Sequence, residues 1–218
     1  YELLGLAQEN EYVIVDNGCA IHRTSDWAVI DSVALDKQDI HYLYSLTHDS
    51  SIQLTLFDEE HYFVVGETPS PIVVRDTGYV FTSPTEISLE EAVSGKYTMF
   101  QAMFLAEKET VDFFEEKYAS DICQHFSGVR SQDVIYEVMP ADVTKAFALE
   151  KLAQKLNIKV DEIMALGDAN NDLEMLKLAG LGIAMGNASD YVKSLADDVT
   201  DSNDENGVAK AIEKYLLN

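Results

Sequence analysis

The sequence predicts an α/β protein in which a parallel sheet flanked by helices is joined to a second, strand-rich α+β domain. Three observations support this fold class. Strand and helix patterns alternate with short loops from residue 144 onward. The segment 23–130 contains mostly short strand-like runs. Finally, residues 163–179 read as a buried strand, a tight turn and the start of a helix, one directly after the other.

The elements follow from the spacing of apolar residues and the position of turn residues. In the first part we expect a helix end at 1–10, strands at 12–15, 28–30, 32–35, 52–57, 61–65, 98–105, 122–126 and 134–139, and helices at 36–48, 88–93 and 107–119. The stretch 66–95 holds three of the four prolines and is expected to be loop-rich with short elements.

The second part has a more regular pattern. Here we expect helices at 144–156, 171–179, 188–195 and 206–217, and strands at 163–166, 181–185 and 198–200. The succession of strand, helix and strand indicates a parallel sheet. The whole order predicts core segments at 1–22 and 131–218, with an α+β domain inserted at 23–130.

Composition excludes several kinds of partner. The formal charge is −24, from 39 acidic and 15 basic residues, which argues against binding to nucleic acids or to anionic membranes. There is no apolar run long enough to span a bilayer. The two cysteines, Cys19 and Cys123, lie far apart without metal-ligand spacing, as expected for free thiols of a cytoplasmic protein.

Carboxylates follow the predicted strand 163–166. Asp168 and Asp172 are four residues apart, so both can face the crevice at the carboxyl end of the strand, with Asn171 beside them. A carboxylate in that place can hold a divalent cation, and the cation can hold a phosphate. The alternative is structural: Asp168 or Asn170 caps the next helix, and Asp172 favours its positive end.

Two further positions suggest an anion site. Lys145 opens a predicted helix, where the helix dipole disfavours a cation, and an ammonium there can bind an anion together with free backbone N–H groups. The alternative is a solvated surface lysine. Asn187 follows the apolar strand 181–185, and we favour a helix cap over a position at the mouth of the crevice.

Together these segments resemble the haloacid dehalogenase (HAD) superfamily, in particular its Cof-type sugar-phosphate phosphatases. The resemblance is carried by Lys145 and by the segments 167–172, 184–188 and 204–209. In addition, residues 12–21 are similar to the strand and turn that lead into the large cap domain of this family. It spans nearly the whole chain, although the middle matches only in length and element type.

The resemblance implies a HAD-like, Rossmann-type core with a large inserted cap, and a Mg²⁺-dependent phosphatase of small phosphomonoesters. Asp168 would bind Mg²⁺, and Asn171 would donate a hydrogen bond to the phosphoryl group or its surroundings. Lys145 would neutralise phosphate charge. Asp172 would orient the loop, and Asn187 would be a supporting residue.

One departure from the family concerns the reaction itself. These phosphatases attack with an aspartate in an Asp-x-Asp-Gly-Thr motif, and this motif does not occur in the 218 residues. The nearest candidate is Asp16, but the residue two positions later is Gly18. We therefore expect that an N-terminal segment with the nucleophile and general acid is missing, and that the chain alone is inactive.

Several possibilities stay open at this point. The missing segment could be supplied by another chain, or the protein could form a homo-oligomer. The alternative to a phosphatase is a non-catalytic phosphate- or metal-binding or regulatory module derived from the same fold. Another HAD reaction, such as phosphoryl transfer within a sugar phosphate, is a third interpretation.

Overall fold

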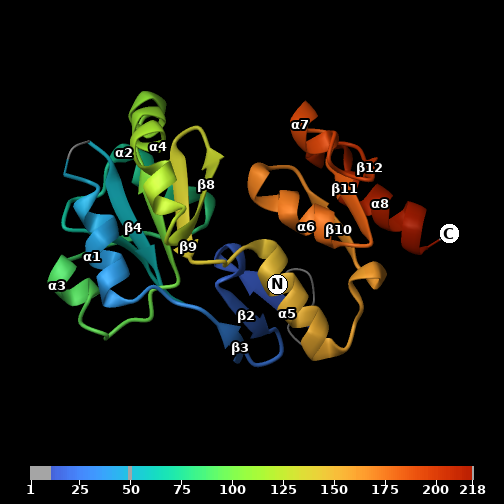
Figure 1. Ribbon diagram of the computed structural model, residues 1–218, viewed down its shortest axis with the longest axis horizontal. Coiled ribbons are helices and arrows are strands. Elements are labelled where there is room, and N and C mark those ends of the chain that lie inside the picture. The colour runs from blue at the N-terminus through green and yellow to red at the C-terminus, as the bar shows by residue number, and fades with distance from the viewer. Residues whose placement is uncertain (1–10, 49–50, 218) are drawn as a thin grey trace. The chain divides into compact units, whose positions relative to one another are not determined.

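The computed structural model describes residues 11–48 and 51–217 (Figure 1). The chain forms two compact units, Tyr1–Val143 and Thr144–Asn218. It is a mixed α/β protein, as predicted, and its parallel sheet lies in the second unit. The helix end expected at 1–10 lies outside the described residues.

The first unit begins with a small antiparallel sheet of three strands in the order β1-β2-β3. These are β1 (Tyr12–Val15), β2 (Ala20–Arg23) and β3 (Val29–Ser32). The prediction of two separate strands at 28–30 and 32–35 is wrong. Residues 29–32 form one strand, because they pair with β2 across a turn closed by the Arg23 N–H and the Ala28 carbonyl.

A six-stranded sheet forms the larger part of this unit, in the order β6-β5-β4-β7-β9-β8. The strands are β4 (Gln53–Phe57), β5 (Tyr62–Val65), β6 (Pro84–Ile87), β7 (Gln101–Leu105), β8 (Phe126–Gln132) and β9 (Ile135–Pro140). All neighbours are antiparallel except β5 and β6. Because β9 belongs to this sheet, the first unit extends to Val143. The division into core and cap at 22 and 130 stays a prediction.

Helices cover both faces of this sheet (Figure 1). One apolar core contains residues of α1 (Lys37–Ser45), α3 (Leu89–Ala92) and α4 (Lys108–Ile122). A second core contains residues of α2 (Pro71–Tyr79). Since side chains of a strand alternate between faces, α2 packs on the opposite face from the other three helices.

The loop-rich stretch contains short elements, as expected. One of them is α2, whose start is stabilised by the Ser70 hydroxyl accepting from the Val73 N–H and by Pro71 in the first turn. One prediction for this region is wrong: residues 122–126 are not a strand, because Ile122 ends α4 and β8 begins only at Phe126. A short apolar run does not by itself distinguish the end of a buried helix from a strand.

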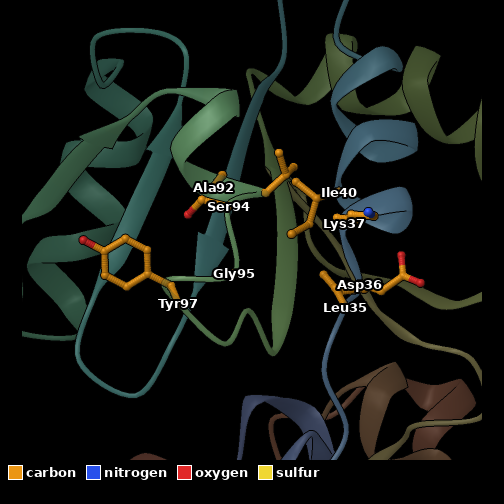
Figure 2. Close-up of a pocket in the computed structure, with 9 residues that line it drawn as sticks. Leu35, Asp36, Lys37, Ile40, Ala92, Ser94, Gly95 and Tyr97 are labelled. Carbon is orange, nitrogen blue, oxygen red and sulfur yellow. The ribbon is translucent and has the colours of Figure 1, made fainter.

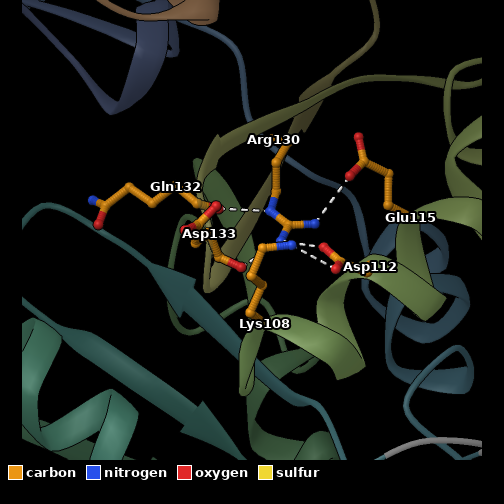
Figure 3. Close-up of polar contacts among 6 residues, drawn as sticks. All are labelled: Lys108, Asp112, Glu115, Arg130, Gln132 and Asp133. Atoms are coloured by element: carbon orange, nitrogen blue, oxygen red, sulfur yellow. Dashed lines mark hydrogen bonds and ion pairs between the residues drawn. The ribbon is translucent and has the colours of Figure 1, made fainter.

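A cluster of charged side chains fixes the irregular end of β8 to α4 (Figure 3). The Arg130 guanidinium donates to Glu115 and Asp112, each at 2.9 Å, and to the main-chain carbonyls of Gln132 and Asp133. The register of β8 and β9 shifts between Arg130 and Gln132. The guanidinium thus binds carbonyl groups where the regular strand pairing is interrupted.

The second unit alternates strands and helices as predicted. Its elements are α5 (Lys145–Leu156), β10 (Met164–Gly167), α6 (Leu173–Leu178), β11 (Leu181–Ala184), α7 (Asp190–Lys193), β12 (Asp198–Val199) and α8 (Gly207–Leu216). The strands are parallel in the order β10-β11-β12, so β10 has one strand neighbour among the described residues. Apolar residues of β10, β11, α6 and α7 form its core.

In the described ranges, every helix is too short or too polar to cross a bilayer. Neither cysteine forms a disulfide: Cys19 is buried and Cys123 is exposed.

Candidate functional site

The segment after β10 has the predicted order of strand, turn and helix. β10 ends at Gly167, a single 3₁₀ turn covers Asn170–Asp172, and α6 begins at Leu173. Asp168 is exposed, whereas Asp172 is buried with 5% of its surface accessible. The two carboxylates therefore lie in different surroundings, and only Asp168 is open to a ligand from solvent.

Asp172 holds the turn and the lysine together. Its Oδ2 accepts hydrogen bonds from the backbone N–H groups of Asp168 (2.9 Å) and Ala169 (3.1 Å). Its Oδ1 accepts from the Lys145 Nζ at 2.6 Å. This carboxylate thus orients the loop that carries Asp168 and fixes Lys145 next to that loop. The structural alternative, in which Asp168 or Asn170 caps the helix, is not observed.

The tight packing around Asp172 explains the glycine before it. A Cβ atom at Gly167 would lie 2.4 Å from the Asp172 Cβ and 2.8 Å from its Oδ2. Real Cβ atoms do not approach this closely, so Asp172 can occupy its place only because residue 167 has no side chain. The Gly-Asp sequence is therefore required by the geometry of the turn.

Lys145 is the first residue of α5, as predicted. The Thr144 hydroxyl caps this helix by accepting from the Phe147 N–H at 3.2 Å. The Lys145 side chain remains 32% accessible although its ammonium is bound to Asp172. The ion pair offsets the unfavourable dipole at this position, and the Lys145 side chain stays partly open to solvent.

Asn187 links the loops that follow neighbouring strands. Its Nδ2 donates to the Asp168 Oδ2 at 2.7 Å, and its Oδ1 accepts from the Asn203 N–H at 3.1 Å. The favoured prediction, a helix cap, is wrong: α7 starts at Asp190, and the Ser189 hydroxyl caps it by accepting from the Val192 N–H. The amide instead holds the Asp168 carboxylate in one orientation.

The strand ends explain why these residues meet. Asp168, Asn187 and Asn203 follow β10, β11 and β12, which are adjacent and parallel. The carboxyl ends of such strands form the ligand crevice of open α/β sheets. Asn171 lies in the same turn as Asp172 with a half-buried side chain, and its contact with a phosphoryl group stays a prediction.

The donors at this crevice fit a Mg²⁺ ion only in part. Within the described residues, no three histidine, cysteine or acidic side chains gather as a metal site. Asp168 alone offers an exposed carboxylate, and Asn187 occupies one of its oxygens. Mg²⁺ commonly takes one or two carboxylates and completes its shell with waters and phosphate oxygens. Asp168 therefore fits as one protein ligand of such a shell.

A buried polar cluster in the first unit was missed from the sequence. The residues of the turn Asp16–Gly18 have positive φ angles of 50°, 52° and 105°. The Asn17 amide and the Gln101 amide (2.6 Å) both donate to the Glu137 Oε2, and Gln101 and Glu137 are nearly inaccessible. The sequence does contain an indication of this cluster, because Gln101 and Glu137 are polar residues within the apolar strand patterns 98–105 and 134–139.

Asp16 itself lies in an unfavourable environment for a charge. Burial raises the pKa of the Asp16 carboxyl to about 6; the nearby His22 acts against this shift, and the negative charges of Glu137 and Asp58 reinforce it. The same burial raises the pKa of the Cys19 thiol. Neither Asp16 nor Cys19 supplies the Asp-x-Asp-Gly-Thr motif, since Gly18 stands two positions after Asp16, where the second aspartate would be.

The first unit also has a cavity of about 330 Å³ between α1 and the turn after α3 (Figure 2). Leu35, Ile40 and Ala92 contribute apolar surface to it. Asp36 lines it too, but its carboxylate accepts from the N–H groups that follow it in the α1 capping box. The cavity contains no histidine, cysteine or second carboxylate among its described lining residues.

Comparison with known proteins identifies the family. A model of haloacid dehalogenase-like hydrolases matches residues 1–212. The chain belongs to this family. The Bacillus subtilis (strain 168) protein YxeH is 31% identical over 214 residues, which are 98% of this chain and 79% of YxeH.

Two further proteins are similar to this chain, one in sequence and one in structure. The 5-amino-6-(5-phospho-D-ribitylamino)uracil phosphatase YcsE of B. subtilis (strain 168) is 52% identical over 81 residues, 37% of this chain and 32% of YcsE. The structure of the HAD phosphatase BT1666 from Bacteroides thetaiotaomicron superposes with a TM-score of 0.78 at 34% identity. The superposition covers 94% of this chain and 73% of BT1666. The HAD-type fold predicted from the sequence is thus confirmed.

Proposed function

We propose that this chain carries the phosphate- and Mg²⁺-binding part of a Cof-type HAD phosphatase that acts on small phosphomonoesters such as sugar phosphates. The main support is the connected set Lys145, Asp172, Asp168 and Asn187 at the ends of parallel strands. Family membership supports hydrolase chemistry, and the name of YcsE, a phosphatase of a phosphoribityl compound, agrees with a small phosphorylated substrate.

Each residue has a proposed role. Asp168 holds Mg²⁺, which when bound supplies positive charge to the phosphoryl oxygens. Lys145 binds the phosphate through its ammonium, which is needed because the chain's net charge of −24 repels anions. Asn171 donates to the phosphoryl group. Asp172 positions Lys145 and the loop, and Asn187 positions the Asp168 carboxylate.

Binding to the 218-residue chain tests this assignment. Titration with inorganic phosphate, with and without Mg²⁺, is followed by calorimetry and by NMR of the Asp168 and Asn187 signals. Lys145→Ala should weaken phosphate binding under both conditions, and Asp168→Ala should remove only the enhancement by Mg²⁺. Lys177→Ala and Asp190→Ala, exposed residues of the same unit, are the matched controls. Equal effects of Lys145→Ala and Lys177→Ala would contradict the proposal.

Turnover is a separate question, because the Asp-x-Asp-Gly-Thr motif is absent from the sequence. We propose that the chain alone has negligible phosphatase activity. A polypeptide with an apolar strand followed by this motif should restore activity by pairing with β10, whose other edge has no strand among the described residues. Hydrolysis of a generic phosphomonoester by the chain alone, lost in Asp168→Ala, would overturn the inactivity.

The alternative is a non-catalytic phosphate- or metal-binding module, which the missing motif favours. Phosphate binding without turnover after addition of the strand polypeptide would support this alternative. Under the phosphatase proposal, residues 23–130 act as the cap that selects the substrate, and the protein works in the cytoplasm. Exchange of surface residues within 23–130 should then change substrate preference without changing phosphate binding.

A further inference from the structure

The end of α2 is a surface that folding within the chain does not explain. Tyr79, Val80 and Phe81 are consecutive apolar residues with exposed fractions of 72%, 59% and 98%. We call these three residues the α2 knob. A quarter of all residues in the chain are charged, yet this protrusion is apolar throughout. Exposed apolar groups of this kind mark interaction sites.

Phe81 is the most unusual residue of the knob. Its φ angle of 56° lies in the left-handed region, where helix ends normally have glycine because a Cβ is disfavoured. Its backbone is held there by hydrogen bonds from the Phe81 and Thr82 N–H groups to the carbonyls of Gly78 and Thr77. The ring gains almost no contacts within the chain, so an intramolecular reason for a phenylalanine at this position is lacking.

A complementary feature lies on the same helix. A cavity of about 110 Å³ is lined by Ile72, Arg75, Asp76, Tyr79, Gln132 and Val134. Arg75 forms no ion pair with any residue in 11–48 or 51–217. A guanidinium without an acidic partner is a good surface for an aromatic ring. The knob and the cavity thus lie next to each other, and Tyr79 belongs to both.

We propose that this surface is the contact of a twofold homodimer, in which Phe81 of each copy packs over Arg75 and into the cavity of the other copy. A twofold contact brings the same patch of both copies together, so it needs a patch with both a protrusion and a matching hollow. A second copy of the chain provides both the protrusion and the hollow, because its Phe81 ring can pack on Arg75 and its cavity can receive Phe81. This inference is independent of the proposed phosphatase activity.

The size and charge of the surface predict how strong the dimer is. Two aromatic side chains and a valine from each copy bury about 1,000 Å² in total, which is near the lower limit for a specific interface. The association should therefore be reversible and in the micromolar range. Each copy also carries a charge of −24, so added salt should strengthen the dimer by screening the repulsion.

A second apolar surface allows a discriminating control. Val208, Ile212 and Leu216 are spaced four residues apart on α8, with exposed fractions of 48%, 37% and 63%. The lysines of this helix, Lys210 and Lys214, are paired with Asp201 and Asp198 and so differ from Arg75. A substitution on this stripe should leave the dimer intact if the α2 knob forms the contact.

Analytical ultracentrifugation of the full 218-residue chain tests the proposal, from about 1 μM to about 100 μM protein at low and high salt. The wild-type chain should show a monomer–dimer equilibrium that tightens with salt. Phe81→Gly should weaken the dimer at least tenfold, and Arg75→Gln should weaken it less. Leu216→Ser should have no effect on association.

The stability of the Phe81→Gly variant keeps the test decisive. At a protein concentration where the wild type is monomeric, glycine relieves the left-handed backbone, so the urea midpoint of this variant should rise rather than fall. A lower midpoint at that concentration would mean that the ring packs within its own chain and would overturn the proposal. So would a wild-type monomer at every concentration, a dimer that survives Phe81→Gly, or a dimer lost in Leu216→Ser.

Discussion

Replacement of Asp172 by asparagine is the most direct test of the site geometry. The substitution keeps the size of the side chain but removes its charge. In the wild type, the Asp168 and Ala169 backbone nitrogens lie 2.9 Å and 3.1 Å from the Asp172 Oδ2. The amide oxygen of the variant can still accept from both N–H groups. The amide NH₂, however, then faces the Lys145 ammonium, and two donors do not bind each other.

The expected loss of stability follows from these three contacts. A hydrogen bond to a charged group is worth about 1.5–3 kcal/mol and a neutral one about 0.5–1.5 kcal/mol, so each backbone contact loses about 1 kcal/mol. The ion pair with Lys145, whose side chain is 32% accessible, adds about 1 kcal/mol. The sum is about 3 kcal/mol, which corresponds to about a hundredfold change in an opening equilibrium.

Amide hydrogen exchange measures this effect locally. The Asp168 and Ala169 amides of Asp172→Asn should exchange about a hundredfold faster than those of the wild type. Asp190→Asn is the matched control, since Asp190 is an exposed carboxylate of the same unit and should have little effect. A double-mutant cycle with Lys145→Met separates the ion pair from the backbone contacts.

Two results would refute the reasoning. Unchanged exchange of the Asp168 and Ala169 amides would mean that the Asp172 carboxylate does not hold the turn. A coupling energy of zero between Asp172 and Lys145 would mean that the 2.6 Å contact contributes nothing, and the positioning of the ammonium would need another cause.

Three further predictions concern Gly167, Asp16 and Asn187. Gly167→Ala should destabilise the second unit, because its Cβ would lie 2.4 Å from the Asp172 Cβ; the urea midpoint followed by circular dichroism measures this. Because the folded-state pKa of Asp16 is raised from 3.8 to about 6, the folded chain keeps a proton that the unfolded chain loses. Stability should therefore fall by on the order of 3 kcal/mol as the pH rises from about 4 to about 7, and Asp16→Asn should remove this fall in urea titrations. Asn187→Ala should weaken Mg²⁺ binding about tenfold or more by releasing Asp168, and calorimetry would reveal the opposite result, an unchanged affinity.

The sequence predicts the part of the fold that depends on local patterns. The alternating elements after residue 144 are confirmed, since apolar spacing and turn residues mark each of them. Lys145 at the start of α5 and Asp168 after β10 also occupy their predicted places. The Lys145 ammonium binds Asp172, four residues after Asp168, and the convergence of Lys145 and Asp168 on one phosphate stays a prediction.

Other features depend on contacts that are distant in sequence. Asparagine is a residue type favoured at helix N-caps. Only the contact of Asn187 with Asp168, nineteen positions earlier, shows that it does not cap a helix. The apolar run 122–126 is compatible with a strand until Ile122 is seen packed in the core with α4. Glu137 was unremarkable within its strand because its partners, Asn17 and Gln101, come from other segments.

The different surroundings of the two cysteines make the chain easy to label. Cys123 is accessible and Cys19 is enclosed, so a maleimide dye or a spin label should attach to one sulfur without any mutagenesis. A tag at Cys123 lies in the same unit as α2 and the sole tryptophan, Trp27. Energy transfer between tagged copies would then report their pairing directly, at concentrations too low for sedimentation.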